Sequence, residues 1–123
     1  MARILLIDDD ADLAETLKEV FEFEKHSVDC AETAQMALQL LGEQNYDLVL
    51  CDWQMPDMDG VDICKQFRSS GGSSRILMLS GVRDADSRAL ALANGADDFL
   101  TKPFTVDDLL ARVKHNLQCV ARD

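Results

Sequence analysis

Three consecutive aspartates, Asp8, Asp9 and Asp10, stand directly after the apolar run Ile4–Ile7. Carboxylates this close disfavour each other's ionised form unless a cation lies among them. Mg²⁺ takes oxygen ligands, and proteins commonly hold it with one or two carboxylates together with phosphate oxygens. The first chemistry that these residues suggest is therefore the binding of a hard divalent cation.

Three further polar residues, Asp52, Ser80 and Lys102, each stand where another short apolar run ends. A lysine can pair with a carboxylate or a phosphate, and a hydroxyl can donate to a phosphate oxygen. A carboxylate beside Mg²⁺, a lysine and a hydroxyl can act as a nucleophile towards phosphorus, which is how aspartyl phosphates form. Phosphoryl transfer needs mainly positioning and neutralisation of oxygen charge, and these residue types supply both.

Five strand–helix units must position these side chains. Apolar runs typical of strands lie at 4–7, 27–31, 48–51, 76–79 and 99–101, the second being the weakest. Apolar residues at helical spacing follow at 13–21, 34–41, 61–67, 85–93 and 109–120, with Gly42 expected to end the second helix and Asn94-Gly95 the fourth. This alternation predicts an α/β fold, a doubly wound (βα)5 sandwich whose five-stranded parallel sheet carries helices on both faces.

The order of the strands decides whether the polar residues meet. Ligands of open α/β sheets bind outside the carboxyl ends of the strands, at the point where the strand order reverses. If the order is 2-1-3-4-5, that point lies between the first and third strands. The acids then converge there, with Ser80 and Lys102 on the neighbouring side.

Composition narrows the function classes. The 123 residues suit one domain, and 47% of them are apolar, enough for a core. The net charge of −11 argues against binding nucleic acid, which needs clustered Lys and Arg. We find no signal peptide and no apolar stretch that could span a membrane, and we expect a cytoplasmic protein without a membrane partner. The cysteines are expected to be small buried residues in a reducing compartment: Cys30, Cys51, Cys64 and Cys119.

The chain resembles the receiver domains of two-component response regulators, the CheY-like superfamily, from about Arg3 to about Val120. Four segments carry the resemblance, in this order: ILLIDDD, DLVLCDWQMPDMDG, RILMLSG and GADDFLTKPF. The resemblance implies a flavodoxin-like fold and one receiver domain over residues 1–123. It also implies phosphorelay signalling, with a phosphoryl group supplied by a sensor histidine kinase or a histidine phosphotransfer protein. Such a domain catalyses only its own phosphorylation and dephosphorylation.

The resemblance also implies a cofactor, Mg²⁺, and a role for each polar residue at the strand ends. Asp52 is the phosphoacceptor and a metal ligand. Asp9 binds Mg²⁺ directly, Asp8 acts largely through water, and the backbone carbonyl of Gln54 is a further ligand.

Three other residues carry the switch that the resemblance implies. Ser80 is the hydroxyl that moves to the phosphate, and Lys102, whose bond to Pro103 is expected to be cis, contacts the phosphate. Phe99 is the rotating aromatic that reports the change on the surface formed by the fourth helix, the fifth strand and the fifth helix. Core packing alone explains Phe99 almost equally well. In this family, the positions of Gln54 and Val82 modulate hydrolysis of the aspartyl phosphate.

Not every acid near the site is expected to do chemistry. Asp10 is expected in the first turn of a helix, where acids favour the helix dipole. Turns and helix caps explain Asp57 and Asp59 better than catalysis does.

The last third of the chain resembles receivers that dimerise through the fourth helix, fifth strand and fifth helix. In that arrangement Arg88 could pair with Asp108, and Asp97 with Arg112, across a twofold axis. Cys119 occupies the third basic position of the pattern, so Asp98 is expected to lack a partner. A homodimer formed on phosphorylation is thus a hypothesis.

Two rival readings remain. A degenerate receiver would only bind partner proteins, but such domains usually lose an acid or the lysine, and none is lost here. A phosphatase of the haloacid dehalogenase type would use the D-x-D spacing of Asp8 and Asp10. That reading gives Asp52 a different role, and the chain is too short to include a cap domain.

Overall fold

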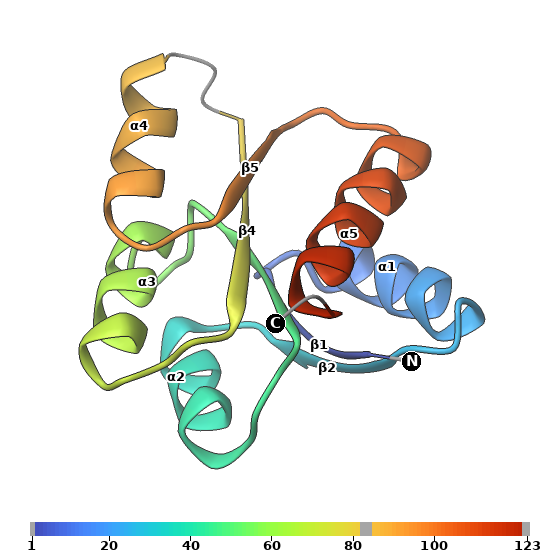
Figure 1. The fold of residues 1–123 in the computed structure, drawn as a ribbon, viewed down its shortest axis with the longest axis horizontal. Helices are drawn as coiled ribbons and strands as arrows, with labels where there is room; N and C mark the ends of the chain where they lie inside the picture. Colours follow the sequence, from blue (N-terminus) through green and yellow to red (C-terminus); the bar gives the residue numbers. More distant parts are fainter. Residues whose placement is uncertain (1, 82–84, 122–123) are drawn as a thin grey trace.

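The computed structural model describes residues 2–81 and 85–121, so Val82 lies outside the described residues. Five strands alternate with five helices along this part of the chain (Figure 1). The strands are β1 (Arg3–Ile7), β2 (Ser27–Ala31), β3 (Leu48–Asp52), β4 (Arg75–Ser80) and β5 (Asp98–Thr101). The helices are α1 (Ala11–Phe23), α2 (Ala34–Glu43), α3 (Gly60–Ser69), α4 (Ala85–Ala93) and α5 (Val106–Ala121).

All neighbouring strands pair in parallel, in the order β2-β1-β3-β4-β5. This order confirms the predicted doubly wound sheet and puts the reversal between β1 and β3. The pairing of Ile7 with Cys51 sets the register there, so Asp8 and Asp52 leave the sheet side by side. The four strands that carry the predicted site residues, β1, β3, β4 and β5, therefore have their carboxyl ends on the same side of the sheet.

Helices cover both faces of the sheet: α1 and α5 lie on one side, and α2, α3 and α4 on the other (Figure 1). Alternate residues of β1 face opposite layers. Leu5 and Ile7 pack into the core under α2, α3 and α4, whereas Ile4 and Leu6 pack into the core under α1 and α5. A strand buried on both faces must be apolar throughout, which explains the uninterrupted run.

The sequence predicted that glycines end two helices, α2 and α4. Gly42 does not end α2, which continues through Glu43. Helix α4 does end before Asn94-Gly95, and Gly95 has a φ of 113°, a conformation that glycine adopts without steric cost. A glycine ends a helix where the chain needs a positive φ, and α2 leaves its last turn in an extended conformation instead, at Gln44.

Candidate functional site

Asp8, Asp9 and Asp52 come together at the carboxyl edge of the sheet. Each offers a carboxylate oxygen, and these three oxygens lie within 4.8 Å of one another. Asp8 is only 1% exposed and Asp52 is also buried, whereas Asp9 is exposed. The cluster is therefore open to solvent on the Asp9 side and buried on the side of Asp8 and Asp52, an arrangement that suits a cation arriving from solution.

Lys102 is the basic residue of this cluster. Its Nζ lies 3.3 Å from Asp52 Oδ1 and 3.6 Å from Asp8 Oδ2. The backbone N–H of Lys102 donates to the Ser80 carbonyl at 2.6 Å, which ties the lysine to the end of β4. The bond from Lys102 to Pro103 is cis, as predicted.

The two oxygens of the Asp8 carboxylate have different surroundings. Oδ1 accepts a hydrogen bond from the Asp10 backbone N–H at 2.9 Å. Oδ2 is buried and has no hydrogen-bond donor among the described residues, although Lys102 lies at ion-pair distance. A buried acceptor without a donor is costly, and a cation or the water bound to a cation would satisfy it. The donor set therefore fits Mg²⁺.

Electrostatics at Asp52 support the same conclusion. Burial raises the pKa of the Asp52 carboxyl above its ordinary value; Lys102 opposes this shift, and the nearby Asp8 adds to it. Lys102 therefore does not fully offset the desolvation of Asp52. A divalent cation at this cluster would favour the ionised form of Asp52.

The backbone around Asp52 is tightly packed. The Trp53 N–H donates to the Leu79 carbonyl at 2.8 Å, which holds the chain after β3 against β4. A Cβ added at Gly60 would stand 2.5 Å from the Asp52 carbonyl oxygen, so the start of α3 rests on this residue. Only glycine permits that approach. Gln54 follows in the same loop, and its carbonyl as a metal ligand stays a prediction.

Ser80 and Phe99 lie on the strands next to the acid cluster. Ser80 is buried at the end of β4 and pairs with Thr101, the residue before Lys102. Phe99 is 3% exposed, and its ring meets Trp53 edge to face with centroids 6.2 Å apart. In this conformation Phe99 is a core residue, and its rotation stays a prediction.

Of the three acids that we assigned to turns and helix starts, Asp10 and Asp57 accept capping hydrogen bonds and Asp59 does not. Asp10 is the N-cap of α1, and its carboxylate accepts from the Leu13 N–H at 3.1 Å. This bond occupies the second acid of the D-x-D spacing, which weakens the phosphatase reading. Asp59 is the N-cap residue of α3 but makes no side-chain capping bond. Asp57 instead caps α2, which no local signal in the sequence indicates.

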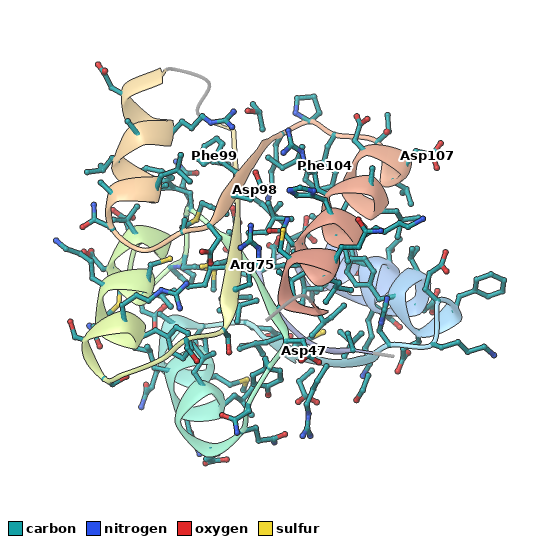
Figure 2. All side chains as sticks on the ribbon, viewed as in Figure 1. Asp47, Arg75, Asp98, Phe99, Phe104 and Asp107 are labelled. Carbon is teal, nitrogen blue, oxygen red and sulfur yellow. The ribbon has the colours of Figure 1, made fainter. Side chains whose placement is uncertain are left out.

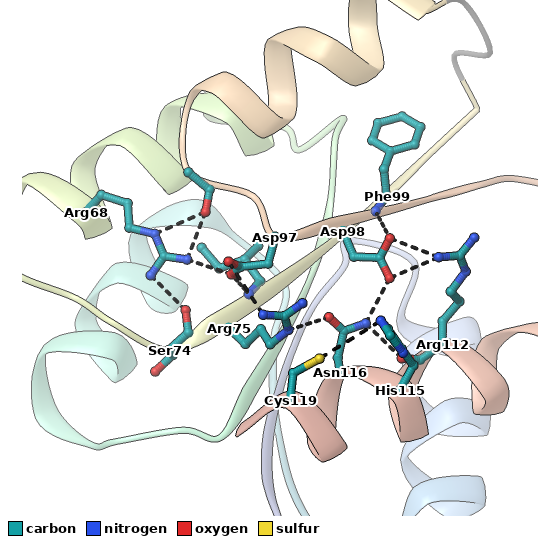
Figure 3. A network of polar contacts seen from close by, with 12 residues as sticks. Arg68, Ser74, Arg75, Asp97, Asp98, Phe99, Arg112, His115, Asn116 and Cys119 are labelled. Carbon is teal, nitrogen blue, oxygen red and sulfur yellow. Dashed lines mark hydrogen bonds and ion pairs between the residues drawn. The ribbon is translucent and has the colours of Figure 1, made fainter. Parts of the chain in front are cut away.

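Two acids of the predicted dimer face have partners within the chain (Figure 3). Asp97 accepts from Arg68 Nη2 at 2.9 Å, and Arg75 Nη1 lies 4.0 Å away. Asp98 pairs with Arg112 of its own chain at 3.1 Å, and its expected lack of a basic partner in a second subunit stays a prediction. The sequence pattern missed this pairing because it considered contacts between subunits only.

The predicted contacts between subunits stay predictions. Arg88 and Asp108 are both exposed, as residues of an interface between subunits must be in the monomer. Arg112, predicted to pair with Asp97 of a second copy, already binds Asp98 here.

The cysteines are all free, but they differ in burial. Cys51 and Cys64 are buried as predicted, and burial raises the pKa of both thiols. Cys30 and Cys119 are partly exposed, because β2 is an edge strand and α5 lies on the surface. Within the described ranges, no helix is long and apolar enough to cross a membrane.

Comparison with known proteins agrees with the fold. The sequence model of the response regulator receiver domain matches residues 4–114. The response regulator MprA of Mycolicibacterium vanbaalenii is 38% identical over 121 residues, which are 98% of this chain and 52% of that protein. The receiver domain of Francisella response regulator 1452 superposes with a TM-score of 0.91 at 32% identity, covering 96% of this chain and 98% of the other. A CheY-like receiver domain protein of Methanospirillum hungatei gives 0.93 at 29% identity, covering 99% and 98%.

The chain therefore belongs to the response regulator receiver family, whose place is in two-component signal transduction. It spans about half the length of the curated relatives it matches.

Proposed function

We propose that residues 1–123 form one receiver domain that accepts a phosphoryl group onto Asp52. The donor is a phosphohistidine of a sensor histidine kinase or of a histidine phosphotransfer protein, and the place of action is the cytoplasm. One observation carries the proposal: the Asp52 carboxylate lies 3.3 Å from Lys102 and shares a cluster of oxygens with Asp8 and Asp9. A nucleophile, a cation site and a lysine thus stand within reach of one phosphoryl group.

In the proposed reaction, a carboxylate oxygen of Asp52 attacks phosphorus. The O–P bond forms as the P–N bond breaks, and the electron pair of that bond leaves with the imidazole of the donor, which takes up a proton. Lys102 is placed to neutralise negative charge on the transferred oxygens. The domain makes one aspartyl phosphate and later loses it to water, and it processes no other substrate.

Mg²⁺ would be held by the carboxylates of Asp8, Asp9 and Asp52 and by the Gln54 carbonyl. Its contribution is charge neutralisation on the transferred phosphoryl group. The Asp8 Oδ2 atom, buried without a hydrogen bond, supports this assignment, as does the raised pKa of Asp52.

The output of the proposed reaction is a shift between two conformations. The phosphate draws in the hydroxyl of Ser80, and Phe99 changes its packing in response. Phe99 is placed to pass the change on, because its ring contacts Trp53 beside the acceptor while its strand, β5, precedes α5. The surface of α4, β5 and α5 would then be altered for a partner.

Dimerisation through Arg88, Asp97, Asp108 and Arg112 is the weaker part of the proposal. Arg112 would have to exchange Asp98 of its own chain for an acid of a second copy. Light scattering at high protein concentration tests this: an unchanged mass after phosphorylation would exclude the dimer.

The decisive experiment measures intact mass after incubation with a small-molecule phosphodonor, with and without Mg²⁺. We expect the wild type to gain one phosphoryl group only when Mg²⁺ is present, and Asp52→Asn to gain none. No gain by the folded wild type would favour a receiver that only binds partners. In that case partner binding would be unaffected by Asp52→Asn.

A further inference from the structure

The loop that connects β3 to α3, residues 53–59, carries the proposed backbone ligand Gln54. A backbone carbonyl cannot reorient by rotating a side chain, so the position of the loop sets the position of this ligand. Both ends of the loop are held by backbone hydrogen bonds: Trp53 donates to Leu79 at 2.8 Å, and Gly60 donates to Trp53 at 2.7 Å. The middle of the loop needs a separate anchor.

Asp57 joins the middle of this loop to another element through two hydrogen bonds of its side chain. Its Oδ1 accepts from the Ala34 N–H at 2.9 Å, and its Oδ2 accepts from the Gln35 N–H at 3.1 Å. Ala34 and Gln35 are the first two residues of α2. N–H groups at the start of a helix have no acceptor within the helix, and the positive end of the helix dipole favours a carboxylate there.

Helix α2 already has a local cap, Thr33, so capping the helix and anchoring the loop can be tested separately. The side chain of Thr33 accepts from the Met36 N–H, and its carbonyl accepts from the Ala37 N–H, each at 3.1 Å. Thr33 and Asp57 together satisfy the first four N–H groups of the helix. Thr33 does so from the residue next to the helix, whereas Asp57 does so from the loop beside the acceptor, 23 residues away in sequence from Ala34.

The hydrogen bonds of Asp57 are those of an ionised carboxylate. Hydrogen bonding from the Ala34 backbone, with a further bond from Gln35, holds the pKa of Asp57 below its ordinary value. The anchor is therefore charged at every pH at which a receiver would act, and it ties the loop to α2 by two bonds of fixed direction.

We propose that Asp57 is a positioning residue of the cation site: by binding the N-terminus of α2, it holds the loop that presents the Gln54 carbonyl. This inference rests on the Mg²⁺ site proposed above. The coupling works in both directions, because a cation that orders the loop must also stabilise the contact between Asp57 and α2. The first turn of α2 thus becomes part of the support of the phosphorylation site.

The test is a Mg²⁺ titration followed by the fluorescence of Trp53, the only tryptophan of the chain, which directly follows Asp52. We expect Asp57→Ala to weaken Mg²⁺ binding about tenfold, as loss of a residue that orients a metal ligand commonly does. Asp57→Asn, which keeps one oxygen acceptor, should give a smaller loss and serves if the alanine variant folds poorly.

Two matched controls separate positioning from other effects. Thr33→Ala removes a cap from the same helix end without touching the loop, so it should lower stability but change the Mg²⁺ dissociation constant less than about twofold. Asp59→Asn removes one negative charge from the same loop, and at physiological salt this should also cost less than about twofold. If either control weakens Mg²⁺ binding as much as Asp57→Ala does, the proposal is overturned.

Amide hydrogen exchange gives a second readout that needs no phosphorylation. Mg²⁺ should slow the exchange of the Ala34 and Gln35 amides in the wild type and leave it unchanged in Asp57→Ala. Suppose that the wild type binds Mg²⁺ and accepts a phosphoryl group, and that Asp57→Ala folds and binds Mg²⁺ equally well. That result would overturn this inference and leave the proposed function intact. A wild type that binds no Mg²⁺ would overturn the cation site and this inference together.

Discussion

Two acidic clusters lie at opposite ends of the strands of the same parallel sheet. The carboxyl-end cluster contains Asp8, Asp9 and Asp52 with Lys102; the amino-end cluster contains Asp97 and Asp98 at the start of β5 with Arg68, Arg75, Arg112 and Asn116. In Figure 2 the labels of Arg75 and Asp98 mark the second cluster between β4, β5 and α5. Both clusters bury carboxylates beside basic side chains, but they differ in how completely those carboxylates are satisfied.

In the amino-end cluster, hydrogen bonds reach both Asp98 oxygens (Figure 3). Oδ1 accepts from the Phe99 N–H at 2.8 Å, Oδ2 accepts from Asn116 at 3.0 Å, and Arg112 contacts both. In the carboxyl-end cluster, Asp8 Oδ2 is buried without any donor within hydrogen-bond distance among the described residues. A satisfied buried acid holds the fold together, and an unsatisfied one is available to a ligand. We therefore call the amino-end cluster the structural cluster, and we propose that the carboxyl-end cluster, built from the same residue types, is the functional cluster.

The largest expected effect comes from breaking the structural cluster. Asp98→Ala removes the carboxylate that Arg112 binds and leaves the fully buried Asn116 amide with only the Arg112 carbonyl as acceptor. We expect a loss of about 3 kcal/mol in the free energy of unfolding. Urea denaturation measures this loss. The Mg²⁺ affinity should be unchanged, and a loss below about 0.5 kcal/mol would mean that the network is not structural.

Mg²⁺ should stabilise the folded protein through the carboxyl-end cluster and not through the amino-end cluster. At about 100 times its dissociation constant, Mg²⁺ should raise the free energy of unfolding by about 2.7 kcal/mol. Thermal unfolding with and without Mg²⁺ measures the effect, and removal of the metal by a chelator should reverse it. Asp52→Asn should lose most of this stabilisation, whereas Asp98→Asn should keep all of it. An equal response in both variants would contradict the assignment of the two clusters.

The smallest predicted effect is a stabilisation, whereas most substitutions of buried residues destabilise a protein. Without Mg²⁺, Asp52→Asn should stabilise the protein at neutral pH by about 1 kcal/mol, because it removes a desolvated charge. Burial raises the pKa of Asp52, so the folded protein holds this proton more tightly than the unfolded chain does. The penalty is therefore present above the raised pKa and disappears as the pH falls through it.

Unfolding curves of the wild type and Asp52→Asn between neutral and acidic pH measure this difference. The advantage of the variant should shrink as the pH falls. An advantage that stays constant or grows on acidification would show that the ionised Asp52 is not the source of the penalty.

The carboxyl-end cluster was predicted from the sequence, and the amino-end cluster was not. Asp8, Asp52, Ser80 and Lys102 could be placed together because each one ends or follows a strand, and parallel strands bring their carboxyl ends to one edge. The pairing of Asp98 with Arg112 depends instead on which face of α5 meets β5. Helical periodicity gives the apolar face of α5, but it does not say which acid an arginine at the border of that face will reach.

Asp57 shows the same limit at the site itself. Its residue type and its neighbours predicted a cap, and a cap is what the structure contains. The helix that it caps is α2, however, and not the adjacent α3. The sequence around Asp57 holds no signal for this choice, because the choice follows from the packing of the β3–α3 loop beside the start of α2.

The sequence by itself determined the parallel sheet and the gathering of polar residues at its carboxyl edge. The physical reason is that strand periods, helix periods and chain alternation are local properties, and parallel strands put their carboxyl ends on one side of the sheet. The strand order that brings Asp8 and Asp52 together is a property of the tertiary structure. Only the tertiary structure decided the partners of Asp57, Asp97 and Asp98, because those contacts join segments that approach each other only after the helices have docked. Among the described residues, the same docking left Asp8 Oδ2 without a hydrogen-bond donor, and this supports the cation site that we propose.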